Sequence, residues 1–436
     1  MKSKKDLYIL LKKQKIYNMK QKLKDFADAI TYKTLLFITM ILSGLIIWSH
    51  RLLVYLDLTN INKTTFGYFG DFDYLYFVST HFLSTGKIYD TVYAYPPPSI
   101  LIILPLSAFS YDTALILKIL SDVFCYIITT YYIFEILKGY NIQVLNLQKI
   151  AIFTSIILFY PITVSFMSGA INAQILTLTT ISYYYLFIQK RITTTSTIIA
   201  IASVFKLIPF ALILLNKKLR IKTIIIITSS LISSILILGI NEHINWINNF
   251  IRTQKLYELS FADFLNPIYS NGFNTSISLS IYKIIGFIHQ PISNTDISII
   301  LSIIKFIIII HFIWFINKTY KYNISKEQDI LYFSLLIILP LLLSNTTWVY
   351  YWTFLAMCMI LWIYVLNLTK HDKIILFVSV FLISTQGILN VIADMIGGTI
   401  KILAYIFPPI TIASILMFAF IWNKIKVINT TTTKSD

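Results

Sequence analysis

Cysteine, acidic side chains and nucleotide-binding glycine motifs are scarce or absent in this sequence. The two cysteines, Cys125 and Cys358, lie within apolar runs without clustered histidines, so neither a disulfide framework nor a zinc site is indicated. The sequence contains no Walker loop and no Rossmann fingerprint, which leaves nucleotide-driven chemistry unsupported. We therefore expect no cofactor and assign no metal ligands.

Charge of either sign is also low. Charged residues make up 13% of the 436 residues and hydrophobic residues 57%, with a mean hydropathy of +0.75. These values exceed what a soluble core requires and are typical of a polytopic, all-helical membrane protein. The 29 Tyr and 31 Phe fit aromatic belts at two membrane interfaces.

The formal net charge of +17 is concentrated at particular places, beginning with nine lysines in the first 24 residues. A polybasic segment before a membrane span favours anionic headgroups over nucleic acid as its partner, at about 1 kcal/mol per charge. We interpret residues 1–33 as a basic cytoplasmic segment, with an amphipathic interfacial helix over 7–30.

The remaining basic residues define a topology. Apolar runs long enough to cross a bilayer are 34–55, 111–137, 149–167, 171–188, 221–240, 296–317, 329–345, 349–367, 374–392 and 402–423. With both termini inside the cell, the basic loops all become cytoplasmic. We therefore predict a multi-pass protein of the cell membrane, with a membrane domain over 34–424, a first external loop over 56–110 and a cytoplasmic tail over 425–436.

Three apolar pieces do not fit simple spans. Residues 99–110 are too short to cross, and this run and the helix-like run 275–288 are predicted to rest on the outer surface. Residues 194–216 begin and end on the basic side, with Lys206 and Pro209 at their middle. Two short helices meeting at these residues satisfy that pattern, and a kinked span with a snorkelling lysine is the alternative.

This topology gathers polar residues at the non-cytoplasmic face. They are Asp71 and Asp73, the Tyr95 to Pro98 run, residues 168–174, Lys206, the loop 241–275 and residues 344–352. Carboxylates, amides, a lysine and aromatic rings are the side chains that a carbohydrate-handling site uses. Acidic groups are costly in a membrane protein, so we expect the first loop to carry the chemistry.

The order of these motifs resembles a known family. Asp71 and Phe72, followed by Gly86, Tyr89 and Tyr95 to Pro97, resemble the first-loop signature of glycosyltransferases with the GT-C fold. Residues 169–174, 206–209, 271–276 and 344–348 resemble, in order, four further elements of the glycosyltransferase 87 family. The glutamine is displaced to Gln174, and no proline occurs within 344–348.

The resemblance implies a GT-C fold with about 12 transmembrane helices, counting ten spans and two half-helices. It also implies transfer of a hexose, typically mannose, from a polyprenyl monophosphate carrier. The acceptor is a lipid-linked molecule or a glycan on the non-cytoplasmic face. A lipid-linked glycan flippase or secondary transporter is the alternative, since it too uses a broken helix and polar groups in the membrane.

Displacement of a polyprenyl phosphate at an anomeric carbon requires a base for the acceptor hydroxyl and stabilisation of the departing phosphate. Asp71 is the candidate base, carried over from the family's first-loop aspartate, and Asp73 is the rival. Two residues along a helix turn a side chain by roughly 200°, so only one of the two carboxylates faces the cavity.

The other candidates each have a functional and a structural interpretation. Lys206 either binds the carrier phosphate or merely snorkels to the membrane surface. Arg252 and Lys255 are the alternative candidates for the phosphate contact. Amides bond sugar hydroxyls or cap helices, and aromatic rings stack on sugars or form the belt. The substrate-binding candidates are Lys206, Tyr95, Asn172, Gln174, His81, Asn271, Asn274, Trp348 and Tyr351. Lys118 and Asp122, four residues apart on one helix, are interpreted as a structural ion pair.

Overall fold

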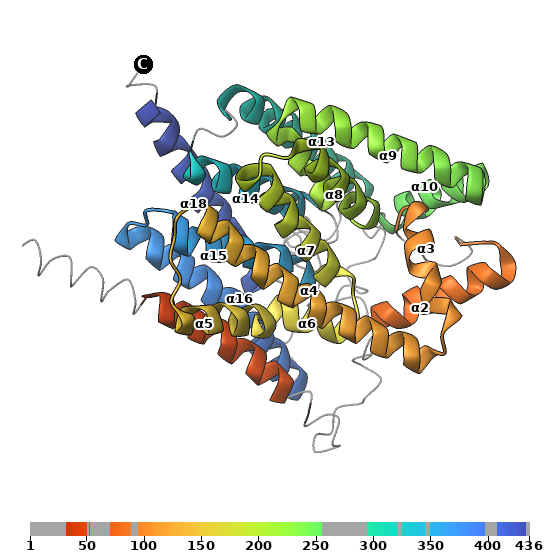
Figure 1. The fold of residues 1–436 in the computed structure, drawn as a ribbon, viewed down its shortest axis with the longest axis horizontal. Coiled ribbons are helices and arrows are strands. Elements are labelled where there is room, and N and C mark those ends of the chain that lie inside the picture. Colours follow the sequence, from red (N-terminus) through yellow and green to blue (C-terminus); the bar gives the residue numbers. More distant parts are fainter. Residues whose placement is uncertain are drawn as a thin grey trace, which may run out of the picture.

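The structure is a computed structural model that describes residues 32–49, 52, 70–88, 95–254, 294–320, 325–344, 349–396 and 408–432. Every regular element within these ranges is a helix and none is a strand (Figure 1), which confirms the all-helical class. The predicted helices at 7–30 and 275–288 lie outside the described residues.

In chain order the elements are an N-terminal helix (Tyr32–Ser49), α2 (Gly70–Thr85), α3 (Pro98–Ile103), the 3-10 helix η2 (Leu104–Ala108), α4 (Tyr111–Gly139), α5 (Asn146–Leu158), α6 (Tyr160–Ser168), α7 (Asn172–Tyr183), the π-helix η3 (Tyr184–Ile188), α8 (Ile192–Phe205), the 3-10 helix η4 (Ile208–Leu215), α9 (Lys217–Leu238), α10 (Ile240–Gln254), α13 (Asn294–Thr319), α14 (Lys326–Leu343), the 3-10 helix η6 (Val349–Phe354), α15 (Leu355–Val365), α16 (Lys370–Ile396) and α18 (Pro409–Thr432). Helices thus occupy each of the ten predicted spans over most of its described length.

Five helices among the described residues are long and apolar enough to cross a membrane. They are Tyr32–Ser49, α4, α9, and the stretches Ile300–Thr319 and Pro409–Thr430. A sixth results if α5 and α6 count as one span, since they meet at a 50° bend. Pro161 lies in the first turn of α6, where it cannot continue the hydrogen bonding of α5. The protein is therefore a multi-pass membrane protein.

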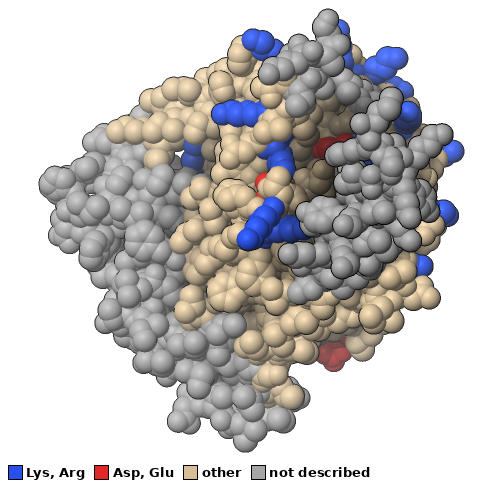
Figure 2. Space-filling model, turned by 90° about the vertical axis from the view of Figure 1, so that its left-hand side faces the viewer, with Lys and Arg blue, Asp and Glu red and all other residues tan. Residues whose placement is uncertain are grey.

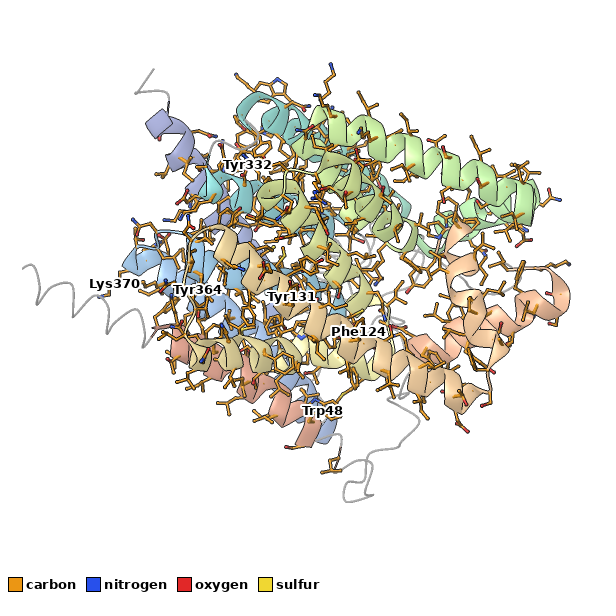
Figure 3. All side chains as sticks on the ribbon, viewed as in Figure 1. Trp48, Phe124, Tyr131, Tyr332, Tyr364 and Lys370 are labelled. Atoms are coloured by element: carbon orange, nitrogen blue, oxygen red, sulfur yellow. The ribbon has the colours of Figure 1, made fainter. Side chains whose placement is uncertain are left out.

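The exposed and buried faces of α4 are reversed relative to a soluble helix. Phe124 and Tyr131, labelled in Figure 3, are 62% and 57% exposed, whereas Lys118 and Asp122 on the same helix are 5% and 2% exposed. Apolar side chains outside and ions inside are the arrangement that lipid requires. Helix α4 therefore turns its charged pair toward the interior of the bundle and its apolar side chains outward.

The two ends of the molecule differ in charge. Helices α2, α3 and α10 lie together at one end, on the right of Figure 1, and Lys370 at the start of α16 lies at the other (Figure 3). Figure 2 looks onto the left-hand side of the Figure 1 view and shows several Lys and Arg side chains on that face. The α2 segment that carries Asp71 therefore lies at the end opposite Lys370.

The break at Lys206 is confirmed. Helix α8 ends at Phe205, Lys206 is extended with φ −143° and ψ 132°, and η4 then begins with Pro209 in its first turn. A second break follows at Asn216, whose side-chain oxygen accepts the Lys218 N–H at 2.8 Å and caps α9. Residues 194–216 are thus two short helical pieces and not one continuous span.

The predicted external loop 241–275 instead begins as helix α10. Ile240, Ile244 and Ile247 recur at helical spacing and are about half exposed, whereas Glu242 and His243 are buried. This amphipathic pattern is typical of an interfacial helix, so residues 241–254 are helical where a loop was predicted.

Candidate active site

The two candidate carboxylates lie in the first turn of α2 and face different surroundings. Asp71 is half-buried and turned toward the bundle, whereas Asp73 is exposed and accepts a hydrogen bond from the Tyr111 hydroxyl at the start of α4. Phe72 between them is fully buried. The expected separation of roughly 200° around the helix is therefore realised, with Asp71 on the inner side.

A small apolar cluster holds α2 against the rest of this end. Its buried members are Leu75, Val78, Ile88, Ile100, Ile103 and Ile171. Tyr95 and Trp246 pack against this cluster, so it joins α2, α3, α10 and the turn before α7. The chain turns into α3 at the prolines, since Pro98 begins α3 and the Ser99 hydroxyl donates to the Pro96 carbonyl at 2.6 Å.

Lys206 brings three distant segments together. Its Nζ donates to Asn172 Oδ1 at 2.6 Å and lies 3.7 Å from the centroid of the Tyr351 ring. The lysine side chain is buried, with 7% of the residue exposed. The Asp71 carboxylate is near enough to interact electrostatically with both Lys206 and Tyr351. A carboxylate, an ammonium group, an amide and an aromatic ring thus share one site.

The turn between α6 and α7 places Asn172. Gly169 ends α6 in the left-handed region with φ 70°, a conformation that favours glycine, and Asn172 is then the first residue of α7. Gln174 lies two residues further along, so it points to another side. Its Nε2 donates to Asp122 Oδ1 at 2.8 Å and to Ser121 Oγ at 3.1 Å, both on α4.

The predicted ion pair on α4 is confirmed. Lys118 Nζ lies 2.6 Å from Asp122 Oδ2, and it also donates to the backbone carbonyl of Ala170 at 3.1 Å. This pair therefore contacts both ends of the turn that carries Asn172, through Ala170 on one side and Gln174 on the other.

Some predicted residues are not brought to this site. His81 lies ten residues beyond Asp71, about 15 Å along the helix axis, and stacks on Phe77 at 5.9 Å between centroids. Asn271, Asn274, Trp348 and Lys255 lie outside the described residues, as does the Arg252 side chain. Trp352, which follows Tyr351, is fully buried.

The sequence analysis above does not single out Glu242, but in the structure this residue bonds to the segment that follows α2. Its Oε2 accepts the Ile88 N–H at 2.8 Å, and the residue is 7% exposed. The next residue, His243, pairs through Nε2 with Ser234 Oγ at 2.8 Å. The repeat of isoleucines four and three residues apart identifies α10 as an amphipathic helix, and Glu242 lies on its polar side.

The described residues form no evident metal-binding cluster. Within it, no group of three or more His, Cys, Asp or Glu side chains is placed to hold a metal ion. The site described above is instead built from Asp71, Asn172, Lys206 and Tyr351.

The fold is that of a helical membrane protein with a buried polar site at one end of its bundle. A sequence model of glycosyltransferase family 87 matches residues 93–310, which is half of the chain. The chain belongs to this family, as its motifs predict, and is a membrane glycosyltransferase. The matched range contains Asn172 and Lys206 but not Asp71 or Tyr351. No curated protein and no solved structure matches the chain significantly.

Proposed function

We propose that the protein transfers a hexose, typically mannose, from a polyprenyl monophosphate carrier to a lipid-linked or glycan acceptor on the non-cytoplasmic face. In this proposal the bundle has the GT-C fold with about 12 membrane-crossing segments, counted with the half-helices. The observation that carries the proposal is that the Asp71 carboxylate lies near enough to the buried Lys206 to interact with it electrostatically, because the reaction needs one base and one phosphate-binding cation.

The reaction is a single displacement. Asp71 removes the proton of the acceptor hydroxyl while that oxygen forms a bond to the anomeric carbon, and the bond from this carbon to the phosphate oxygen breaks. The carrier enters as a phosphodiester with one negative charge and leaves as a phosphomonoester with two. Attack on the face opposite the leaving group inverts the anomeric centre.

Lys206 fits the role of phosphate contact because negative charge increases there as the bond breaks. A buried ammonium group interacts with phosphate as a point charge in surroundings of low polarity, where the interaction is strong. The Tyr351 ring and the Asn172 amide orient the ammonium group before the substrate arrives. The site is therefore preorganised for charge at the departing phosphate.

The face of action follows from the charge distribution. Several Lys and Arg side chains lie on the face of the molecule opposite α2, α3 and α10 (Figure 2). By the positive-inside rule the basic end is cytoplasmic, so the Asp71 site is non-cytoplasmic. The transporter alternative has less support, because membership of a glycosyltransferase family favours transfer over transport.

The proposal is tested by incubating membranes that contain the protein with radiolabelled polyprenyl phosphate mannose. Membranes that contain Asp71→Asn serve as the matched control. Label that reaches a lipid or glycan acceptor only with the unmodified protein supports the proposal. If the protein accepts another polyprenyl phosphate sugar as donor and does not accept polyprenyl phosphate mannose, the assignment of mannose is wrong. Passage of label across the membrane without transfer supports the transporter alternative.

A further inference from the structure

The ion pair on α4 makes hydrogen bonds to residues outside the pair. Lys118 and Asp122 are buried inside the bundle, yet each makes a hydrogen bond outside the pair, to Ala170 and Gln174 respectively. These two residues flank Asn172 on the chain. Asn172 is fully buried and is the residue whose Oδ1 holds Lys206 Nζ.

We propose that Lys118, Asp122 and Gln174 are positioning residues that fix Asn172, and through it the Lys206 ammonium group, for the donor phosphate. This inference rests on the proposed function. None of the three residues needs to touch substrate, since Gln174 Nε2 is directed to Asp122 and Ser121. Gln174, a substrate-binding candidate from sequence, thereby acquires a different role.

Two features of the turn make such a support necessary. The chain reverses at Gly169 in a left-handed conformation, and the Ala170 N–H reaches only the Ser168 hydroxyl at 3.3 Å and the Ser165 carbonyl at 3.3 Å. These are long contacts, so the Ala170 amide restrains its part of the turn weakly. The contacts from α4 are shorter or charged, and they define the position of the first turn of α7.

The rest of the α4 and α7 interface supplies a matched control. One turn beyond Gln174, the Thr177 hydroxyl contacts the Cys125 carbonyl at 2.9 Å and Thr129 Oγ1 at 2.9 Å. Thr177→Val removes the contacts of this hydroxyl, including one to the Ala173 carbonyl of its own helix at 2.9 Å, but leaves the Ala170, Gln174 and Lys206 hydrogen bonds in place. A merely structural role predicts equal effects for the two positions, whereas positioning predicts an effect only at Gln174.

The test is a double-mutant cycle on the apparent donor affinity. Gln174→Met is expected to raise the KM for the donor by about tenfold, and Thr177→Val to leave it unchanged. In an Asn172→Ala background, Gln174→Met is expected to have no further effect, because its route to Lys206 is already removed. An equal effect in both backgrounds, or an unchanged KM for Gln174→Met, overturns the proposal.

A second pair of substitutions tests the ion pair itself. Lys118→Met with Asp122→Leu removes both charges together, so that no lone charge remains in the bundle. This double variant is expected to raise the donor KM at least as much as Gln174→Met does, with unchanged thermal unfolding. A normal donor KM in the folded double variant would show that the pair does not position the site.

A substrate-free measurement separates this proposal from the proposed function. Modification of Lys206 by an amine-directed acylating reagent, followed by peptide mass spectrometry, reports how firmly its ammonium group is held. Labelling is expected to be several-fold faster in Gln174→Met and unchanged in Thr177→Val. Equal rates in all three proteins overturn the positioning role. If labelling changes as expected but no polyprenyl phosphate sugar is used, the proposed function fails and the positioning role stands.

Discussion

The sharpest prediction concerns the two carboxylates of α2. Asp71→Asn and Asp73→Asn are nearly isosteric changes two residues apart, and each removes one negative charge. Asp71 interacts with Lys206 and Tyr351, whereas Asp73 is exposed and bonded to Tyr111. We expect the two substitutions to differ strongly in their effect on turnover.

The magnitude follows from the two environments. Removal of a general base lowers kcat by about 10²- to 10⁴-fold, which is the expectation for Asp71→Asn. Asparagine at position 73 retains an oxygen that accepts the Tyr111 hydroxyl, and substitutions at exposed positions change rates by about twofold at most. The two variants should therefore differ by about 50-fold or more in kcat.

The donor KM provides a second test of the role of Asp71. Asp71→Asn removes a negative charge near the site of the donor phosphate and leaves Lys206 with one fewer anionic neighbour. The KM for the donor should therefore stay constant or fall while kcat falls, which identifies a loss at the transition state. A rise in donor KM with normal kcat would contradict the role of Asp71 as base.

The assay is transfer of radiolabel from polyprenyl phosphate mannose in membranes with equal amounts of each protein, measured over a range of donor concentrations. If Asp73→Asn is inactive and Asp71→Asn is not, the base is Asp73 and the inner position of Asp71 has another purpose. Full activity in both variants would refute the carboxylate mechanism.

Three further predictions concern other parts of the molecule. Lys206→Met should raise the donor KM by about 10- to 100-fold, because a charged hydrogen bond to phosphate contributes about 1.5–3 kcal/mol; unchanged kinetics would exclude it from the phosphate site. Glu242→Leu removes the carboxylate that accepts the Ile88 N–H and should destabilise the protein by about 1–3 kcal/mol in thermal unfolding, whereas Glu242→Gln should cost less. Burial by itself raises the pKa of Asp372, but hydrogen bonds from Lys424 and Thr369 outweigh it and lower this pKa below its ordinary 3.8. Its stabilising contribution should therefore be complete above that value and disappear as the pH falls through the lowered pKa, so that the difference in unfolding temperature from Asp372→Asn vanishes in acid.

The helices and the break at Lys206 could be predicted because the bilayer imposes simple rules. Span length is set by membrane thickness, and the lysines mark which helix ends lie on the same side. Those rules favoured two short helices over a kinked span for residues 194–216, and the structure has two short helical pieces there. Proline supplied the local reason, since it begins η4 directly after the extended Lys206.

The contacts inside the site could not be predicted in the same way. Lys206 meets Asn172, 34 residues earlier, and Tyr351, far later in the chain, and only packing decides such pairs. Helical geometry predicted that Asp71 and Asp73 diverge but not which of them faces inward. Gln174 was expected to contact sugar and is bonded to Asp122, while Glu242 carries no local signal of burial.

The partners of Lys206 also bear on how a donor would bind. A lysine in a membrane bundle is tolerated because its ammonium group already has compensation, here from the Asn172 oxygen, the Tyr351 ring and the nearby Asp71 carboxylate. On the proposed function, the singly charged donor phosphate already gains from this ammonium group in the ground state, and the donor KM of Lys206→Met measures that gain. The doubly charged leaving phosphate gains more from the same ammonium group. Lys206 would then favour the transition state over the bound donor, which is the condition for raising kcat and not merely affinity.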